Sequence, residues 1–181
     1  MDLGRLQQLL APFARTLDAA HRTDHAARVR ERACGWIESE SLHDAELALV
    51  QTLALLLPFR ASLQQTATRA AVEAVFVEAG WSAIKIRELF RALERLPDAP
   101  KSLEEKLVAD ADTIDRLGLI GLVRAMASAG ASGQELGEAL ASLRKVLARR
   151  LYTPYGHRDA TAAREALRGL LREIESAFAQ K

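Results

Sequence analysis

Helical periodicity is the sequence feature that most constrains the fold of this chain of 181 residues. Helix signals run along nearly its whole length, with Ala, Leu, Arg and Glu abundant and β-branched residues sparse. No stretch shows the sustained alternation of apolar and polar residues that is typical of a half-buried strand. The sequence therefore predicts an all-α protein.

Start and stop signals divide this pattern into about eight or nine helices joined by short loops. Helices are predicted at 3–17, 22–38, 43–57, 62–79, 82–96, 102–109, 113–129, 132–151 and 159–179. Ser102 with Glu105, and Ser132 with Glu135, have the spacing of a capping box, which satisfies N–H groups at a helix start. Since no low-complexity linker, internal repeat or shift in composition divides the chain, we expect one helical-bundle domain over 1–181.

Composition excludes several classes of function. The net charge of +1 lacks the basic excess of nucleic-acid-binding proteins, so no nucleic-acid partner is expected. Cys34 is the only cysteine, which rules out an internal disulfide and a thiolate zinc cluster, and its apolar setting indicates a buried, unreactive thiol. No uncharged run approaches the about 20 residues of a membrane span, and the first residues lack the pattern of a signal peptide. We therefore expect a cytoplasmic protein without a membrane partner.

Three aspartates interrupt an otherwise apolar helical run. Asp110, Asp112 and Asp115 lie in LVADADTIDRLGLIGLVRA at 107–125. A carboxylate near a core costs several kcal/mol unless it is paired, hydrogen-bonded or bound to a metal. The segment is therefore a solvated helix start, a catalytic or metal site, or the remains of one. Asp110 and Asp115 could also cap the helix predicted to begin near position 113, where acids are stabilising.

Two histidines share one face of an early predicted helix. His21 and His25 are four positions apart in AHRTDHAARV, a spacing that can bind a metal. In a helix-rich protein this spacing is more often an ordinary surface or half-buried pair. His43 and Asp44 adjoin each other at a predicted helix start, where the acid is favourable to the helix dipole.

Three stretches carry a combined pattern of histidine, arginine, aspartate and glycine. They read AHRTDHAARVRERA at 20–33, LEEKLVADADTIDRLGLIGLVRA at 103–125 and LYTPYGHRDATAAREALRGLL at 151–171. Together they resemble the HD-domain superfamily of metal-dependent phosphohydrolases, and in particular its small, stand-alone bacterial proteins. The second stretch is the most specific, and the resemblance spans about 20–175. It implies the same all-α bundle that the helix signals predict.

The resemblance also implies a set of metal ligands, of which half are missing here. In the family a divalent metal is held by a His, an adjacent His-Asp dyad and a later Asp. His25 corresponds to the first and Asp112 to the last, but Leu57 and Pro58 stand where the dyad should be. The literal His-Asp pair at 43–44 lies at the wrong end of that helix, about four turns away.

Ligand number decides what this loss means. A hydrolytic metal site needs at least three protein ligands and an open position for water. His25 and Asp112 are weak candidate metal ligands on their own. His21 lies one helical turn from His25, and no second residue is evident that would orient its ring toward a metal. We therefore expect no metal and no other cofactor, and no family-type phosphohydrolysis. A divalent metal would be the cofactor if this interpretation were wrong.

Without a metal, a basic side chain is expected to neutralise Asp112. Arg60 is nearest in sequence to the missing dyad, and Arg28 and Arg124 are the other candidates. A bidentate pair between a guanidinium and the carboxylate would satisfy the buried charge. The residues expected around the remnant pocket are thus His25, Asp112, Arg28, Asp110, Arg60, Arg124 and His21.

Three classes of function stay open from the sequence. The first, which we favour, is a non-catalytic or repurposed HD-like protein that binds a small molecule or regulates. The second is a residual phosphohydrolase, or a metal-independent enzyme of a biosynthetic kind, that uses the remnant pocket. The third is a scaffold that acts as a homodimer, for which the apolar helix face at 71–81 could supply the interface, although that face is more typical of a core helix.

Overall fold

The computed structural model describes residues 3–14 and 23–179, and these residues are almost entirely helical. The helices are α1 (Leu3–Ala14), α2 (Thr23–Ser39), α3 (Leu47–Leu56), α4 (Thr66–Glu78), α5 (Ala83–Arg95), α6 (Leu103–Asp115), α7 (Gly118–Ser132), α8 (Leu136–Ala148) and α9 (Pro154–Ala179), with short 3-10 helices η1 (Leu57–Phe59) and η2 (Ser62–Gln64). No strand occurs within the described ranges. The predicted all-α bundle is confirmed.

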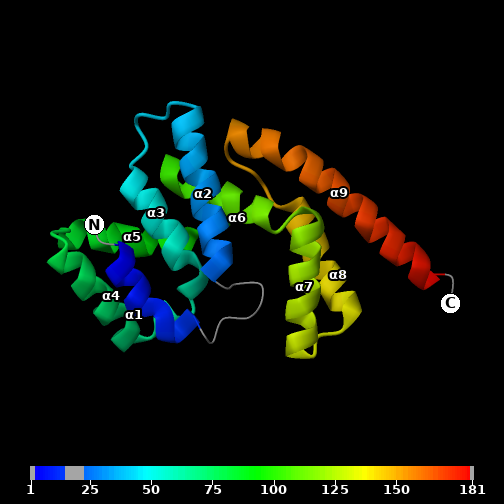
Figure 1. The fold of residues 1–181 in the computed structure, drawn as a ribbon, viewed down its shortest axis with the longest axis horizontal. Coiled ribbons are helices and arrows are strands. Elements are labelled where there is room, and N and C mark those ends of the chain that lie inside the picture. Colours follow the sequence, from blue (N-terminus) through cyan, green and yellow to red (C-terminus); the bar gives the residue numbers. More distant parts are fainter. Residues whose placement is uncertain (1–2, 15–22, 180–181) are drawn as a thin grey trace.

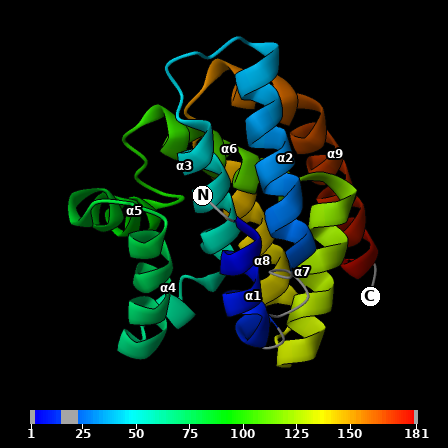
Figure 2. The same cartoon turned by 60° about the vertical axis from the view of Figure 1, so that its left-hand side comes forward.

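The helices gather around α6. Helix α2 packs against both α3 and α6, whereas α9 packs against α6, α7 and α8. Figure 1 shows α1, α4 and α5 on one side of this centre and α7, α8 and the long α9 on the other, and the turned view of Figure 2 keeps α4 and α5 apart from α7 and α9. One apolar core runs through the bundle, from Leu6 in α1 to Leu167 in α9.

Helix α6 is buried along most of its length, which explains how its carboxylates come to lie inside the protein. It begins where the Ser102 hydroxyl accepts a hydrogen bond from the Glu105 N–H at 3.3 Å, as the capping-box spacing predicts. Every residue from Leu107 to Asp115 is buried. The three aspartates therefore need partners from other elements.

Several predicted helix boundaries are shifted by three residues or more, and three of them are wrong for identifiable reasons. The break predicted at 109–113 is absent because α6 continues to Asp115, and its aspartates find tertiary partners instead of capping a new helix. Ser132 ends α7 and does not begin α8, since Gly133 follows with a φ of 69° that suits a helix C-terminus. Helix α9 begins at Pro154 and not at 159, with proline in the first-turn position that it favours.

The predicted apolar face at 71–81 is part of the core. Val72 and Phe76 of α4 are fully buried, and Trp81 packs on Phe76 with ring centroids 4.8 Å apart. The stretch contains valines at 72, 75 and 77, and of these only Val77 is exposed, with 62% of its surface accessible. Within the described ranges, no helix combines the length and the apolar character that crossing a membrane requires.

Candidate functional site

His25 lies at the centre of a buried ionic cluster between α2 and α6. Its Nδ1 is 2.6 Å from a carboxylate oxygen of Asp115, and its Nε2 is 3.0 Å from one of Asp112. The exposed fraction of the side chain is 1% for both His25 and Asp112. Because carboxylates only accept hydrogen bonds, both ring nitrogens are arranged to donate, and this favours the imidazolium form.

Four arginines surround these carboxylates. Nε of Arg116 donates to both oxygens of Asp112 at 3.1 Å, and Nη1 of Arg149 lies 3.4 Å from the same carboxylate. Asp115 accepts from Nε of Arg28 at 2.6 Å and from Nη1 of Arg124. We call this set the His25 cluster; it consists of His25, Asp112, Asp115, Arg28, Arg116, Arg124 and Arg149.

The pairing in the cluster stabilises the charged forms. Burial alone would raise the pKa of Asp112, but Arg116, His25 and Arg149 outweigh it and lower that pKa to about 2. The pKa of Asp115 is likewise held well below its usual range, because His25 and the nearby arginines overcome the effect of burial. Burial acts to lower the pKa of His25, but the two carboxylates dominate and raise it above its ordinary value. The cluster is therefore a network of full charges near neutral pH.

Asp110, on the same helix, faces a different element and has a structural role. Its carboxylate accepts hydrogen bonds from the Thr153 N–H at 2.8 Å, the Thr153 hydroxyl at 2.6 Å and the Tyr152 N–H at 2.9 Å. Burial raises the pKa of Asp110, although these hydrogen bonds oppose the rise. Asp110 thus holds the segment that leads into α9, and the prediction that places it in the remnant pocket is corrected.

The structure brings together some of the predicted site residues and not others. Arg28 and Arg124 join the cluster, but they pair with Asp115 and not with Asp112. Arg60 is elsewhere, donating to the Leu96 carbonyl, so its predicted role is wrong. Asp115 is no helix-start cap either, because it is the last residue of α6. His21 falls outside the described residues.

The two arginines on Asp112 were missed from the sequence. Arg116 stands four positions after Asp112, at the C-terminal cap of α6, and this is a spacing at which opposite charges meet on a helix. A predicted helix running through 115 would have revealed the pair. Arg149 comes from just beyond α8 and is 37 positions away in sequence. Nothing local in the sequence connects it with Asp112. The general expectation that a guanidinium neutralises Asp112 is nevertheless confirmed.

The residues present do not fit the metal centre that the HD resemblance implies. Asp112 is fully engaged by His25, Arg116 and Arg149. Leu57 is buried in the core and Pro58 follows it in η1, and neither side chain can coordinate an ion. Across 3–14 and 23–179, no group of three or more His, Cys, Asp or Glu side chains is placed to hold a metal ion.

A cavity of about 170 Å³ adjoins the cluster between α7 and α8. Asp115, Arg116 and Arg124 form its charged wall. The remaining lining includes Gly121, Ala125, Ser128, Gln134, Ala139, Ser142, Leu143 and Val146. The lining offers guanidinium groups, hydroxyls and an amide to a small polar ligand, and apolar side chains make up the rest of the wall.

Comparison with known proteins identifies relatives of this chain. It is 33% identical to the uncharacterized protein YpgQ of Bacillus subtilis (strain 168) over an alignment of 129 residues, and the match covers 65% of this chain and 62% of that protein. The chain thus matches less than two thirds of this relative's length. No family model matches the chain.

Solved structures of similar fold extend over almost the whole chain. The crystal structure of Bacillus subtilis YpgQ in complex with ADP superposes with a TM-score of 0.71 at 23% identity, covering 94% of this chain and 96% of that one. A crystal structure from Lactobacillus plantarum gives a TM-score of 0.72 at 19% identity, covering 96% and 93%. These similarities establish the shared helical fold.

Proposed function

We propose that this protein is a non-catalytic HD-like protein of the bacterial cytoplasm, in which the His25 cluster replaces the metal centre of the family. Its function would be to bind a small anionic molecule, with a nucleotide as the class of ligand. The observation that carries the proposal is Asp112, the last ligand of the implied metal site, which is buried and already neutralised by Arg116, Arg149 and His25.

The state of His25 argues against an alternative enzymatic role. A general base needs a neutral imidazole within hydrogen-bond reach of the substrate. His25 is 1% exposed, both of its nitrogens face carboxylates, and its raised pKa favours the charged form. A residual phosphohydrolase or a metal-independent enzyme would therefore need another residue to supply the base.

The charge of the cluster supports an anionic ligand. Four guanidinium groups and one imidazolium surround two buried carboxylates. Among the contacts of these arginines within residues 3–14 and 23–179, the acids Asp24 and Asp98 are largely exposed to solvent. Arginine binds phosphate with matching geometry, often through two parallel hydrogen bonds. The cavity beside Arg116 and Arg124 is where a phosphate group could meet this excess of positive charge.

The size of that cavity and the relative with a bound nucleotide narrow the ligand class. A volume of about 170 Å³ is below the roughly 300–1,000 Å³ of a complete small-molecule site, so it would hold only part of a ligand, such as its phosphates. YpgQ, which shares the fold, has been crystallised with ADP. We therefore choose ADP as the first ligand to test.

Calorimetric titration of the full-length protein with ADP, in chelator and without added metal, tests the binding site. We expect saturable binding that weakens at least tenfold in Arg116→Gln, which removes a charge from the wall, and in Ala125→Leu, which fills the cavity. Arg144→Gln, at an exposed position of α8 that is paired with Glu175 of α9 and does not line the cavity, is the matched control and should bind as the unchanged protein does. Absence of binding at millimolar ADP, or equal binding by Arg116→Gln, would refute the proposed ligand class.

Metal analysis tests the second part of the proposal, that the site holds no metal ion and does not hydrolyse its ligand. Protein purified without chelator is expected to contain far less than one equivalent of Mn, Fe, Ni or Zn, and to release no phosphate from ADP when Mn²⁺ or Mg²⁺ is added. Stoichiometric metal, or hydrolysis that chelator abolishes, would favour the phosphohydrolase alternative.

A homodimer is compatible with this proposal. An exposed apolar strip on α7 consists of Leu119, Ile120 and Val123, whose exposed fractions are 60%, 61% and 58%. Light scattering during size-exclusion chromatography measures the oligomeric state directly. A dimer that dissociates in Ile120→Glu would place the interface on this strip.

A further inference from the structure

A second cavity, of about 230 Å³, lies between α1, α2 and the α3–η1 segment. None of its lining residues belongs to the His25 cluster. The lining consists of Gln7, Leu10, Ala11, Ala14, Ala26, Ala27, Arg30, Leu55 and Phe59. Seven of these nine side chains are apolar, and four are alanines, whose short side chains leave the space between the helices open.

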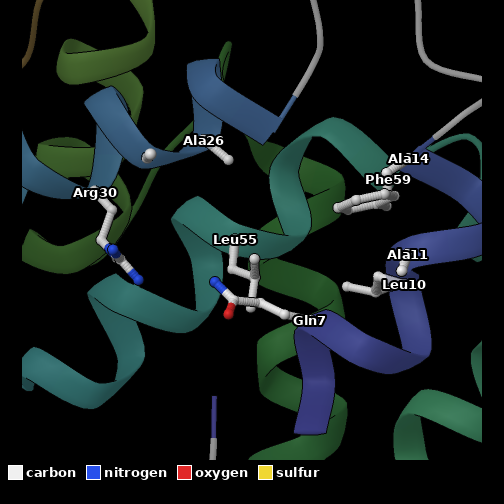
Figure 3. Close-up of a pocket in the computed structure, with 9 residues that line it drawn as sticks. Gln7, Leu10, Ala11, Ala14, Ala26, Arg30, Leu55 and Phe59 are labelled. Carbon is white, nitrogen blue, oxygen red and sulfur yellow. The ribbon is translucent and has the colours of Figure 1, made fainter. Parts of the chain in front are cut away.

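The polar and apolar parts of this lining are separated. Figure 3 shows the polar ends of Arg30 and Gln7 pointing toward each other beside Leu55. Phe59 and Ala14 lie on the opposite side of the same view, where Leu10 and Ala11 continue the apolar wall. The cavity therefore has one polar end and one apolar end.

Arg30 supplies a positive charge at the polar end. Within the described ranges its guanidinium has no hydrogen bond to a carboxylate and no ion pair, whereas its neighbours Arg28 and Arg32 on α2 each contact an aspartate. Phe59 and Leu10, at the other end, are 2% and 1% exposed and belong to the core. An unpaired guanidinium facing an apolar cavity suits an anionic head attached to an apolar body.

We propose that this cavity binds a medium-chain carboxylic acid, with the carboxylate on Arg30 and Gln7 and the alkyl chain against Leu10, Leu55 and Phe59. The volume sets the chain length. At about 30 Å³ for each group, 230 Å³ holds roughly seven or eight groups, which matches octanoate when its seven alkyl carbons and its whole carboxylate are each counted as one group. The site is independent of the proposed nucleotide site, since the two cavities share no residue.

The length series of alkyl carboxylates gives the first test. Calorimetry on the full-length protein with butyrate, hexanoate, octanoate and dodecanoate should show affinity rising about fourfold for each methylene up to octanoate, because each buried methylene contributes about 0.8 kcal/mol. Affinity should stop rising beyond that length. Affinity independent of chain length, or no binding of octanoate at millimolar concentration, would overturn the proposal.

The charged head is tested by ligand and by variant. Methyl octanoate, which keeps the chain but lacks the charge, should bind at least tenfold more weakly than octanoate to the unchanged protein. Arg30→Gln should weaken octanoate binding by a similar factor and leave methyl octanoate binding unaltered. Equal affinity for the acid and its ester would show that Arg30 does not recognise a carboxylate, and the proposal would fail even if the variant did not fold.

Two further variants separate the cavity from nonspecific binding. Ala11→Leu fills the apolar end and should abolish octanoate binding, whereas Arg32→Gln, on the same helix outside the lining, should leave it unchanged. Octanoate that binds Ala11→Leu as tightly as the unchanged protein is bound elsewhere, and this would refute the site. ADP titrations of Ala11→Leu report on the other cavity separately, so failure of one proposal does not imply failure of the other.

Discussion

Asp112 shows how side chains of the protein itself can keep a single buried carboxylate charged. It accepts from Arg116 and contacts His25 and Arg149, so that three cationic groups share one acid. In the function proposed above, side chains take the place of a metal ion, and guanidinium and imidazolium groups offer no open coordination position for water. At this position the protein has a fixed charge pair where its resemblance to HD proteins implies a reactive centre.

Asp112→Asn is therefore expected to destabilise the protein strongly. The change removes the anion but leaves the partly buried arginines and His25 without their partner, and breaking a buried ion pair costs about 3–5 kcal/mol. Urea denaturation measures the free energy of unfolding of the variant and the unchanged protein. Asp44→Asn, at an exposed position in the turn before α3, should change it by less than about 0.5 kcal/mol. Similar values for both variants would contradict the structural role assigned to Asp112.

The titration of His25 predicts how stability depends on pH. Its pKa is raised in the folded protein, because Asp112 and Asp115 outweigh the effect of burial. The His25 contribution is therefore fully present below the unfolded value of about 6.5 and is lost as the pH rises through the raised folded pKa. The free energy of unfolding should fall across that range in the unchanged protein, and this fall should be smaller in His25→Gln. If NMR spectra showed the His25 ring titrating with a pKa at or below 6.5, the predicted pH dependence of stability would be refuted.

At the scale of the elements, α6 and the start of α9 depend on each other. Asp110 lies on α6 and holds the backbone of Tyr152 and Thr153, and the Thr153 hydroxyl in turn accepts from the Gly156 N–H at 3.0 Å. The close contact between Asp110 and the backbone at the start of α9 requires glycine at 156, since a Cβ there would lie 2.3 Å from an Asp110 oxygen. The glycine and the aspartate act together, although they are 46 positions apart.

Gly156→Ala should accordingly destabilise the protein by about 1–3 kcal/mol, the usual cost of inserting a group where no space exists. The free energy of unfolding from urea titration again provides the measurement. Gly169→Ala, in the same helix, is the matched control, because a Cβ at that position meets nothing within 4 Å. It should be neutral or stabilising by up to about 1 kcal/mol, since alanine is the better helix former. If both variants were equally stable, Asp110 could move aside and would not fix the start of α9.

For the whole molecule, a single apolar core predicts a single cooperative unfolding transition. Trp36 and Trp81 report on different sides of the bundle: Trp36 donates to Asp159 of α9 at 2.8 Å, whereas Trp81 packs on Phe76 of α4. In Trp36→Phe and Trp81→Phe, the remaining tryptophan fluorescence and the far-ultraviolet circular dichroism should follow the same denaturant midpoint. Distinct midpoints within one variant would mean that the two sides unfold separately and that the chain is not one domain.

The implied alignment with HD proteins is also tested on the whole fold. Leu57→His combined with Pro58→Asp restores the dyad at the end of α3. If the alignment is correct, the double variant should gain measurable affinity for Mn²⁺ by calorimetry, because the new side chains would lie beside His25 and Asp112. A folded double variant that binds no more metal than the original protein would show that this segment is misaligned.

The sequence by itself determined the helical class and most helix positions, and it led us to expect an incomplete set of metal ligands. These features depend on local helix propensity, capping and residue chemistry, which can be inferred from the sequence without knowing the fold. Which arginine meets which aspartate was decided only by the tertiary structure. Arg149 reaches Asp112 across 37 positions, and α6 continues through 110–115 because distant partners satisfy its carboxylates. Local rules alone favoured a break there, since the free energy of a buried charge depends on neighbours that only the packed bundle supplies.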